Sequence, residues 1–546
     1  MKSIPFMVAA SAALLAASMA AQQPPATPPA GTPPPGSMPP PQGAPGQPAG
    51  APGAQPGRGG GRGNPMAARF TEVCAACHGT STAKGPVGPS LFDAEWLHGS
   101  DDESIVKSIR EGFPEKGMPP LKDTLTDQEV WQMVAYIRIQ TANLKEKPVY
   151  VPDPDGQIVK SEKQAFKMEI VARNLETPWA LAFLPDGRLL VTERPGRIRI
   201  VEKNGAMAPE PVKGLPKVWE KQDGGLFDVE AHPDYARNGW IYISYSETLE
   251  GWVPPPPPDP NAPPPAAAPG GRGRGGPPDP PSMTVILRGR LKNNELVDQQ
   301  VLFRAPKEIY NSQNAHYGSR FTFDRQNHLF FSLGEKQQML DSQDLSKPTG
   351  KIHRINDDGT IPKDNPYAGR ANAAPNALPS IWSYGHRNPQ GLAWDPVTGQ
   401  LWESEHGPTG GDEINVIQPG HNYGWGVITM GIQNGITKRS EPGMEQPITY
   451  WTPSVAPSGI AFYTGSRYAG WKNNLFVSCL AGQQLKRLEI ANGKVTHEEQ
   501  VFNQFGRVHD VIQGPDGYLY VTLQLPGQVL SQSTPGMVAR LVPVKP

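Results

Sequence analysis

The 546-residue chain has almost no net charge. Its 51 lysines and arginines are balanced by 52 aspartates and glutamates, which gives a formal net charge of -1. Without a long-range positive field there is no electrostatic reason to expect binding to DNA, RNA or an anionic membrane. Two short arginine-glycine segments, 58–63 and 271–276, lie in proline-rich sequence without interleaved aromatic residues that could stack on bases. We therefore expect no nucleic acid partner.

Long apolar runs are also scarce. One run, Ile4–Leu15, follows Lys2 and leads into small residues at 18–21, which is the pattern of a secretory signal peptide. It is shorter than the about 20 apolar residues that a membrane-spanning helix needs. No cysteine follows the small residues to carry a lipid. We expect 1–21 to be a cleaved signal peptide, and the mature protein to be periplasmic without membrane insertion.

Proline and glycine, in contrast, are abundant, with 64 and 59 residues. Such a composition is typical of disorder when it is spread evenly, but here 45 of these residues lie in two tracts, 22–65 and 254–281. The first tract predicts a disordered, extended linker because proline runs favour the polyproline II conformation. The rest of the chain has ordinary globular composition.

The segment 66–146 has the apolar period of helices. Ile105, Ile109 and Phe113 are spaced four residues apart, which predicts a helix over 101–113. Thr126 and Glu129 form a capping-box pattern ahead of a second apolar helix. We expect a small all-α domain here, followed by a linker over 147–165.

From Phe166 onward the period changes from 3.6 to 2, which is typical of strands. One unit recurs six times: an apolar strand, a turn with proline, aspartate or glycine, and a second strand rich in β-branched and aromatic residues. Its copies lie at 181–192, 229–244, 321–332, 392–402, 460–478 and 511–522. Six copies predict an all-β six-bladed β-propeller over 166–546, in preference to a β-sandwich. The 254–281 tract is then a disordered insert in one blade.

The strongest local motif is Cys74-Ala-Ala-Cys77-His78. This is the attachment pattern of c-type haem, in which two thiols form thioethers and the following imidazole binds the iron. A disulfide between the two cysteines or a zinc site would leave the histidine unexplained. Met118, in a loop 40 residues after His78, is our candidate for the second iron ligand. The unit therefore resembles a class I cytochrome c with one covalent haem, whereas Cys479, in an apolar strand, is expected to be an inert buried thiol.

Three propeller segments carry groups suited to chemistry. His316 lies where a loop is expected to enter the central channel of the propeller. Arg387 and Asn388 offer a planar fork and an amide to a ligand that bears carboxylates. The segment 405–413 combines acidic groups, carbonyls and glycine turns in the manner of a calcium site.

Together these segments resemble the soluble pyrroloquinoline quinone (PQQ)-dependent aldose (glucose/sorbosone) dehydrogenases, which are six-bladed propellers. The resemblance covers about 166–546. It implies a general base that takes the proton of the anomeric hydroxyl, contacts to PQQ, calcium ligands that polarise the quinone, and a second calcium site. His316 matches the general base, and Arg387, Asn388 and Arg507 match the PQQ contacts. The carbonyls of Gly407 and Pro408 match the calcium ligands, and Glu413 and Tyr423 match part of the second calcium site.

The chain departs from the family pattern at three positions. Asp223 stands where the best-known members have glutamine, Ala481 where some have a cofactor-binding lysine, and His509 where a second arginine lies near Arg507. These changes make the predicted pocket less cationic, which weakens binding of a tricarboxylate such as PQQ unless another lysine, Gln483 or Gln484 compensates.

The sequence thus predicts a periplasmic quinohaemoprotein dehydrogenase that oxidises an aldose or related alcohol by hydride transfer to PQQ. Electrons would pass to its own haem, at high effective concentration because it is tethered, and then to an external cytochrome or respiratory chain component. The alternative is a cytochrome fused to a non-catalytic propeller that binds carbohydrate or protein, with a decayed quinone site. The altered pocket favours that alternative, and the retained site residues favour the enzyme. A hydrolase is disfavoured because no nucleophile elbow is present.

Overall fold

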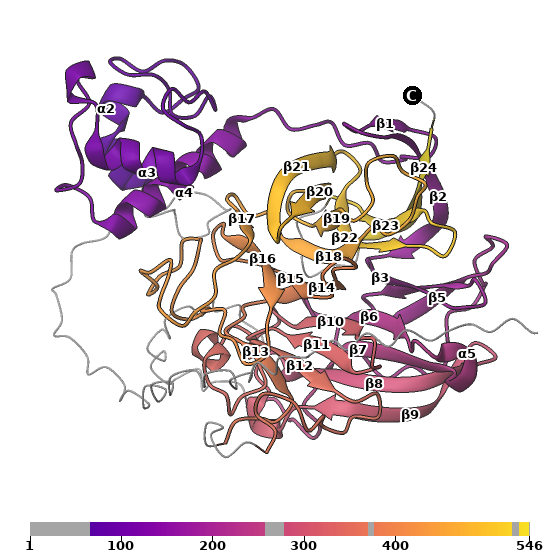
Figure 1. Cartoon of the computed structure of the whole chain (residues 1–546). Helices are drawn as coiled ribbons and strands as arrows, with labels where there is room; N and C mark the ends of the chain where they lie inside the picture. Colours follow the sequence, from indigo (N-terminus) through magenta and orange to yellow (C-terminus); the bar gives the residue numbers. More distant parts are fainter. Residues whose placement is uncertain (1–65, 257–277, 370–375, 527–533, 545–546) are drawn as a thin grey trace, which may run out of the picture. The chain divides into compact units, whose positions relative to one another are not determined.

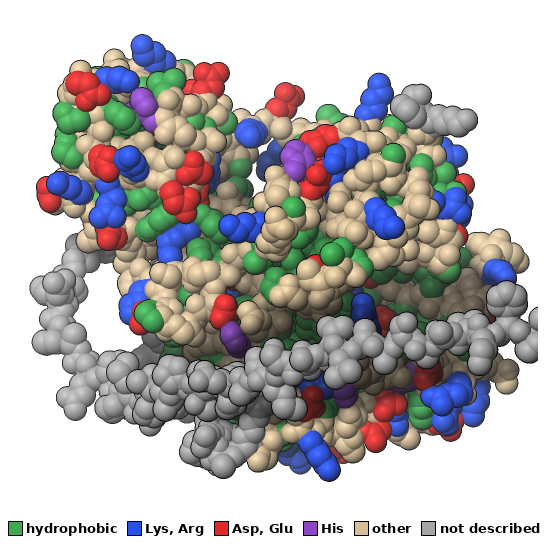
Figure 2. Space-filling view, viewed as in Figure 1, with side chains coloured by type: hydrophobic (Ala, Val, Ile, Leu, Met, Phe, Trp, Pro, Cys, Tyr) green, Lys and Arg blue, Asp and Glu red, His purple; other side chains and the backbone are tan. Residues whose placement is uncertain are grey.

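The computed structural model describes residues 66–256, 278–369, 376–526 and 534–544 (Figure 1). The predicted signal peptide and the 22–65 linker lie outside these ranges. No helix within them is both long and apolar enough to cross a membrane. Acidic and basic side chains are interspersed over the face seen in Figure 2, as the near-zero net charge suggests.

The helical domain packs its helices around one apolar core. Its elements are α1 (Met66–Val73), α2 (Ala75–His78), α3 (Asp102–Glu111), the 3-10 turn η1 (Pro114–Lys116) and α4 (Asp127–Leu144). The predicted capping box is present at the start of α4, where the Thr126 side chain accepts from Glu129 N and the Glu129 carboxylate accepts from Thr126 N. The core is formed by residues including Phe70, Ile105, Ile109, Met133 and Ile137.

The predicted helix over 101–113 is shorter in the structure. Asp101 caps its start by accepting from Ser104 N, and the helix ends at Glu111 because Gly112 adopts φ +63° and turns the chain. Phe113 therefore lies beyond the helix, where its ring stacks on His98 at 4.0 Å. The i, i+4, i+8 spacing thus extends two residues beyond the helix end, across a glycine that favours that end.

The rest of the described chain forms six antiparallel sheets, which are the six blades (Figure 1). The first three blades consist of β3 (Pro178–Phe183), β4 (Leu189–Glu193) and β5 (Arg197–Val201); of β6 (Leu226–Ala231), β7 (Trp240–Thr248), β8 (Ser282–Lys292) and β9 (Glu295–Arg304); and of β10 (Gly318–Phe323), β11 (Leu329–Leu333), β12 (Lys351–Ile355) and β13 (Ile381–Tyr384). The next two consist of β14 (Pro389–Trp394), β15 (Leu401–Glu405), β16 (Asp412–Ile417) and β17 (Thr449–Trp451), and of β18 (Pro457–Phe462), β19 (Leu475–Cys479), β20 (Gln484–Ala491) and β21 (Lys494–Phe502). The last blade has the strand order β1 (Ile158–Lys160), β2 (Ala165–Glu176), β24 (Pro535–Pro543), β23 (Leu519–Gln524) and β22 (Arg507–Gln513). Short turns of helix are α5 (Tyr235–Asn238), η2 (Lys307–Ile309) and η3 (Met339–Ser342).

Each of the six predicted repeats forms the first two strands of one blade, so the predicted fold class is confirmed. The second strand lies inside its blade, and the two faces of the blade pack against the neighbouring blades. The strand is therefore buried on both faces, which explains its apolar and aromatic composition. Its central residues are fully buried in every blade: Val191, Ile243, Phe331, Trp402, Val477 and Val521. The thiol of Cys479, at the end of β19, is also fully buried, and burial raises its pKa.

The ring is closed by pairing of distant parts of the chain. The first strands contact one another in the order β3, β6, β10, β14, β18, β22 and back to β3. The last blade joins β2 to the C-terminal strand β24, which lie side by side in Figure 1 in purple and yellow. Strand β1, which pairs with β2, falls inside the segment 147–165 that was predicted to be a linker.

The 254–281 tract connects β7 and β8, which pair over the whole of β7, from Trp240–Arg290 to Thr248–Ser282. It is therefore an insertion at the tip of a hairpin in one blade. Residues 257–277 of it lie outside the described part of the chain.

A buried arginine joins the innermost strands at the centre of the ring. Arg320 of β10 forms ion pairs with Asp228 of β6 at 3.4 Å and Asp510 of β22 at 3.1 Å. Its Nε donates to the carbonyl of Gln390 in β14, and its guanidinium lies 4.4 Å from the ring centre of Trp179 in β3. One side chain thus connects five of the six blades.

Candidate functional site

The haem motif lies in an apolar cavity of the helical domain. Cys74, Cys77 and His78 line it together with apolar side chains such as Ile105, Ile109 and Ile137. All three cysteines of the chain are free thiols, so Cys74 and Cys77 are not joined to each other. Burial raises the pKa of Cys74 to about 11.

The imidazole of His78 is oriented by its neighbours. Its Nδ1 lies 2.8 Å from the carbonyl oxygen of Pro89, which only accepts, so Nδ1 carries the proton and Nε2 is the free ligand atom. A Cβ on Gly88 would lie 2.9 Å from the ring, so only glycine leaves room for the histidine there. Met118 lines the same cavity, and its backbone pairs with Phe113. The residue set fits a c-type haem with His78 and Met118 as the candidate ligands.

The propeller residues singled out in the sequence gather at one end of the innermost strands. Asp223 precedes β6, His316 precedes β10, and Arg387 with Asn388 precedes β14. Gly407 and Pro408 follow β15, and Arg507 begins β22. Because all first strands run in the same direction around the channel, their starts meet at one mouth of the propeller.

His316 is held by a carboxylate that the sequence analysis missed. Its Nδ1 lies 2.7 Å from Glu335 Oε1, and Glu335 is buried two residues beyond the end of β11. The carboxylate accepts the Nδ1 proton, which leaves Nε2 as the basic atom. His316 has φ +57°, and its backbone N–H donates to Asp223 Oδ2 at 3.4 Å. The only sequence signal for Glu335 is its place just after a predicted second strand.

Arg387 and Asn388 support the loop that follows β15. Arg387 Nη1 donates to the carbonyl of His406 at 3.1 Å, and its guanidinium lies 5.1 Å from the ring centre of Trp425. Asn388 is fully buried, with Oδ1 accepting from Gly318 N and Nδ2 lying 3.2 Å from Nδ1 of His406. It therefore links the His316 loop to the loop at 406–412.

The loop at 406–412 presents backbone oxygens. Asp412 is buried and holds the loop by accepting from Gly407 N at 2.8 Å, while its other oxygen accepts from residues 454–456. Gly410 and Gly411 both have φ +71°. In the described part of the chain the carbonyl oxygens of Gly407 and Pro408 accept no hydrogen bond, so both are available to a hard cation.

A group of buried carboxylates lies beneath this loop. Asn415 Nδ2 donates to Glu403, Glu405 and Glu413 over 3.1–3.4 Å. Glu405 also accepts from the backbone N–H of Arg387 and approaches His386 Nδ1 at 3.3 Å. Burial and the Glu405 charge raise the pKa of Glu403 and Glu413 well above the usual range.

Tyr423 packs against this group, because its ring stacks on His386 at 4.7 Å and its hydroxyl donates to Val416 O. Glu413 and Tyr423, the residues matched to a second calcium site, thus line one small cavity together with Glu405 and Gly407.

The charged residues around Asp223 include a buried arginine, Arg194, that the sequence motifs did not indicate. Burial lowers the pKa of both Arg387 and Arg507, and the Asp223 charge opposes that shift, together with Glu335, Asp412 and Glu405 in the case of Arg387. Arg194, which directly follows β4, is a further buried arginine, which forms an ion pair with Glu220 at 3.4 Å and whose charge disfavours the charged form of Arg507. It was not singled out in the sequence because no motif surrounds it.

The positions that replace cationic residues of the family remain uncharged. His509 is buried against Trp179, and burial together with Arg507 lowers its pKa well below the usual value, so the ring is neutral. Ala481 lies in an exposed turn, and Gln484 is buried with no partner for its Oε1 among the described residues.

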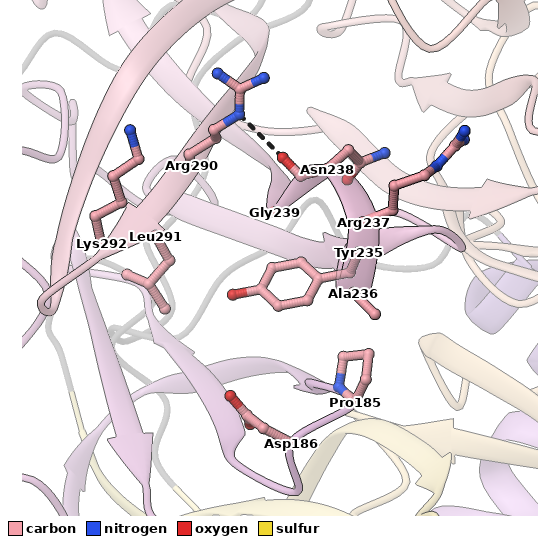
Figure 3. A pocket seen from close by; sticks show the side chains of 10 residues that line it. All are labelled: Pro185, Asp186, Tyr235, Ala236, Arg237, Asn238, Gly239, Arg290, Leu291 and Lys292. Atoms are coloured by element: carbon pink, nitrogen blue, oxygen red, sulfur yellow. Dashed lines mark hydrogen bonds between the residues drawn. The ribbon is translucent and has the colours of Figure 1, made fainter.

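A separate groove of about 620 Å³ lies on the outer surface between the first two blades (Figure 3). Pro185 and Asp186 form one wall, and Tyr235, Arg237 and Arg290 the other, with Arg290 Nε donating to the carbonyl of Asn238 at 2.9 Å. None of the site residues described above lines it.

Comparison with known proteins agrees with this architecture. Residues 175–531 match the family model described as Glucose / Sorbosone dehydrogenase, and residues 61–137 match that described as Cytochrome C oxidase, cbb3-type, subunit III. The chain is 38% identical over 377 residues to the aldose sugar dehydrogenase YliI of Escherichia coli, which covers 67% of this chain and 92% of that protein.

Two solved structures are similar over the propeller. The soluble aldose sugar dehydrogenase of Escherichia coli superposes with a TM-score of 0.59 at 35% identity, covering 69% of this chain and 100% of that one. The PQQ-bound form of an aldose sugar dehydrogenase from Streptomyces coelicolor gives 0.50 at 25% identity, covering 71% and 100%. The chain therefore belongs to the glucose/sorbosone dehydrogenase family and carries a cytochrome c domain at the N-terminal side of its propeller.

Proposed function

We propose that the protein is a periplasmic quinohaemoprotein that oxidises an aldose or a related alcohol, with PQQ and calcium in the propeller and covalent haem c in the helical domain. The observation that carries the proposal is the His316–Glu335 pair, which lies at the same channel mouth as the arginines and the free carbonyl oxygens. A base, cations for an acidic cofactor and ligands for a hard cation are the parts that this reaction needs.

The base acts on the proton of the sugar hydroxyl. Glu335 keeps Nδ1 of His316 protonated, so Nε2 accepts the hydroxyl proton and the carboxylate stabilises the resulting imidazolium. PQQ, when bound, would accept the hydride from the sugar carbon that carries this hydroxyl. Sugar oxidation thus releases one hydride and one proton, and this chain provides the site for the proton.

The cofactor carboxylates would be held by the buried guanidinium groups of Arg387 and Arg507, with Arg194, which also forms an ion pair with Glu220 at 3.4 Å, beside Arg507. Arginine suits such a ligand because its planar fork matches carboxylate geometry. The carbonyls of Gly407 and Pro408 would bind calcium, held in place by Asp412. The residues present therefore fit both groups.

The haem domain supplies a one-electron outlet. The apolar cavity, the two free thiols, and His78 and Met118 along its walls fit haem c. Because the domain is part of the same chain, its haem is present at high effective concentration for the propeller. An external cytochrome or respiratory chain component would then take the electrons onward.

The test is reconstitution of the purified holocytochrome with PQQ, calcium and a panel of aldoses, followed by haem absorption. We expect reduction that requires both additions and a sugar. Omitting PQQ, omitting calcium and supplying a non-reducing disaccharide are the controls. If no sugar, alcohol or aldehyde reduces the haem and PQQ does not bind, the propeller is a binding module and the proposal is wrong.

A further inference from the structure

A buried lysine lies directly against the loop that carries His316. Lys336 follows Glu335 in the turn after β11, and its side chain is 0% exposed. Its Nζ donates to the carbonyl oxygen of Gln313 and lies 3.6 Å from the ring centre of Tyr317. The ammonium group thus contacts the His316 loop on both sides of the histidine. Lysine is rarely buried so completely unless its charge has a defined partner.

The two segments are also locked together through their backbones. The N–H of Lys336 donates to the carbonyl of His316 at 3.2 Å. A Cβ on Gly334 would lie 2.2 Å from that same carbonyl oxygen, so the close approach requires glycine there. His316 and Lys336 both adopt left-handed backbone conformations, with φ +57° and +54°. Non-glycine residues hold such angles only where surrounding contacts impose them.

Two carboxylates explain how the turn tolerates a cation. Asp223 and Glu335 favour the charged form of Lys336, whereas burial lowers its pKa to about 7. The same two carboxylates contact His316, Asp223 through the backbone N–H and Glu335 through Nδ1. Neither forms an ion pair with Lys336 within 4.0 Å in the described part of the chain. The lysine therefore balances their charge without competing with His316 for either oxygen.

Lys336 cannot contact a ligand in the channel, because its Nζ is enclosed by Gln313 and Tyr317. We propose that Lys336 is a positioning residue for the sugar oxidation, which fixes the 313–317 loop against the Glu335 turn and so keeps Nδ1 of His316 on the carboxylate. This inference rests on the proposed function of His316 as the base. A base displaced by about 1 Å can lose about 100-fold in rate.

The chain offers a matched control in the same blade. Lys351 of β12 is also 0% exposed, its Nζ donates to the carbonyls of Asp341 and Thr349, and burial lowers its pKa to about 7 as well. Among the described residues, its Nζ hydrogen bonds go to Asp341 and Thr349 and none to the 313–317 loop. Lys351→Met therefore reproduces the loss of a buried, carbonyl-bound ammonium without touching the base.

The experiment compares Lys336→Met, Lys336→Arg and Lys351→Met in the full holocytochrome loaded with PQQ and calcium. We expect Lys336→Met to lower kcat for the aldose by about tenfold to 100-fold, with KM changed less than about twofold, because the base and not the sugar contacts is displaced. Lys336→Arg keeps the charge and should recover part of kcat. Lys351→Met should retain wild-type kcat.

A second readout does not depend on activity. In hydrogen–deuterium exchange, backbone amides of the 311–318 segment should exchange faster in Lys336→Met than in the wild type, and at the wild-type rate in Lys351→Met. An unchanged kcat with unchanged exchange in Lys336→Met overturns the inference. If the wild type itself reduces no haem, the proposed function fails, and unchanged exchange would then overturn the loop-fixing role separately. If Lys336→Met does not fold, wild-type kcat in folded Lys336→Gln overturns the inference.

Discussion

The haem site and the sugar site are built in opposite ways. Three of the four haem-binding candidates lie within five consecutive residues, 74–78, and Met118 follows 40 residues later. The propeller site draws Asp223, His316, Glu335, Arg387 and Arg507 from loops and strand starts of different blades, separated by up to 284 residues. A contiguous motif fixes the first site locally, whereas closure of the ring fixes the second.

Because the two sites depend on different contacts, we expect them to respond to different substitutions. The haem cavity depends on its own small core, around Phe70 and Met133, and on the short segments that line it. The sugar site depends on contacts between blades, such as the bond from Asn388 to Gly318 and the Arg320 network. Substitutions in the propeller should therefore abolish sugar oxidation while leaving the haem spectrum intact, and substitutions at the haem should do the converse.

The largest effect should come from His316→Ala. Without the base, sugar-driven haem reduction should fall by about 10²-fold to 10⁴-fold, because general base catalysis contributes rate factors of that size. The haem absorption and its chemical reduction by dithionite should be unchanged. Stopped-flow absorption of the haem with saturating aldose measures this, and a variant that keeps a rate within threefold of the wild type would remove His316 from the mechanism.

Met118→Ala tests the candidate second iron ligand in the haem domain. The haem should stay attached through Cys74 and Cys77, but its potential should fall because loss of the thioether removes the ligand that raises it. Haem reduction by the sugar should slow by about tenfold or more, whereas oxidation of the sugar by an artificial dye acceptor should keep its rate. Potentiometric titration and the dye assay together decide this; an unaltered potential would mean that Met118 is not the ligand.

Asp223→Gln removes a negative charge near the arginines proposed to hold PQQ. The negative charge of Asp223 acts on both Arg387 and Arg507, so its removal leaves more net positive charge for the acidic cofactor. We expect PQQ to bind about fivefold more tightly, equivalent to about 1 kcal/mol, in a fluorescence titration of the cofactor-free protein. Asp186→Gln, in the outer groove of Figure 3, is the matched control and should leave the affinity unchanged. Weaker binding in Asp223→Gln would show that the carboxylate assists the site.

The smallest effect concerns pH and the centre of the ring. Burial, with the neighbouring Asp510, raises the pKa of Asp228 to about 7 although Arg320 opposes the shift. Between about pH 4 and 7 the folded state then holds a proton that the unfolded chain has lost, so this group makes stability fall as pH rises. Asp228→Asn should flatten that slope and shift the difference in Tm between pH 5 and 8 by about 2–4 °C. An unchanged slope in calorimetry would mean that Asp228 is ionised throughout this range.

Much of the fold could be predicted because its signal is repeated. Each blade supplies an apolar pair of strands and a turn, and the six copies coincide with β3–β4, β6–β7, β10–β11, β14–β15, β18–β19 and β22–β23. The closure by β2 and β24 could not be predicted in the same way, because pairing between residues 165–176 and 535–543 leaves no local pattern. The early end of α3 followed from one glycine conformation that the apolar spacing does not encode.

Much less of the site could be predicted, because contacts between distant segments leave no local sequence pattern. His316, Arg387 and the 406–412 loop stood out because glycine and polar residues interrupt the blade pattern around them. Glu335, Arg194 and Lys336 lie just after second strands in ordinary sequence, and only the fold brings them to the mouth of the channel. Their partners, such as Gln313 for Lys336, are distant along the chain and become visible only in three dimensions.

In the proposed reaction, electrons from the sugar pass from the propeller to the haem of the same chain. The most direct test of this transfer is anaerobic stopped-flow reduction of the haem in the PQQ- and calcium-loaded protein, mixed with excess aldose over a tenfold range of protein concentration. We expect a first-order rate that does not depend on protein concentration, because donor and acceptor are tethered. A rate proportional to protein concentration, or no reduction of the haem in protein that oxidises the sugar with a dye, would contradict it.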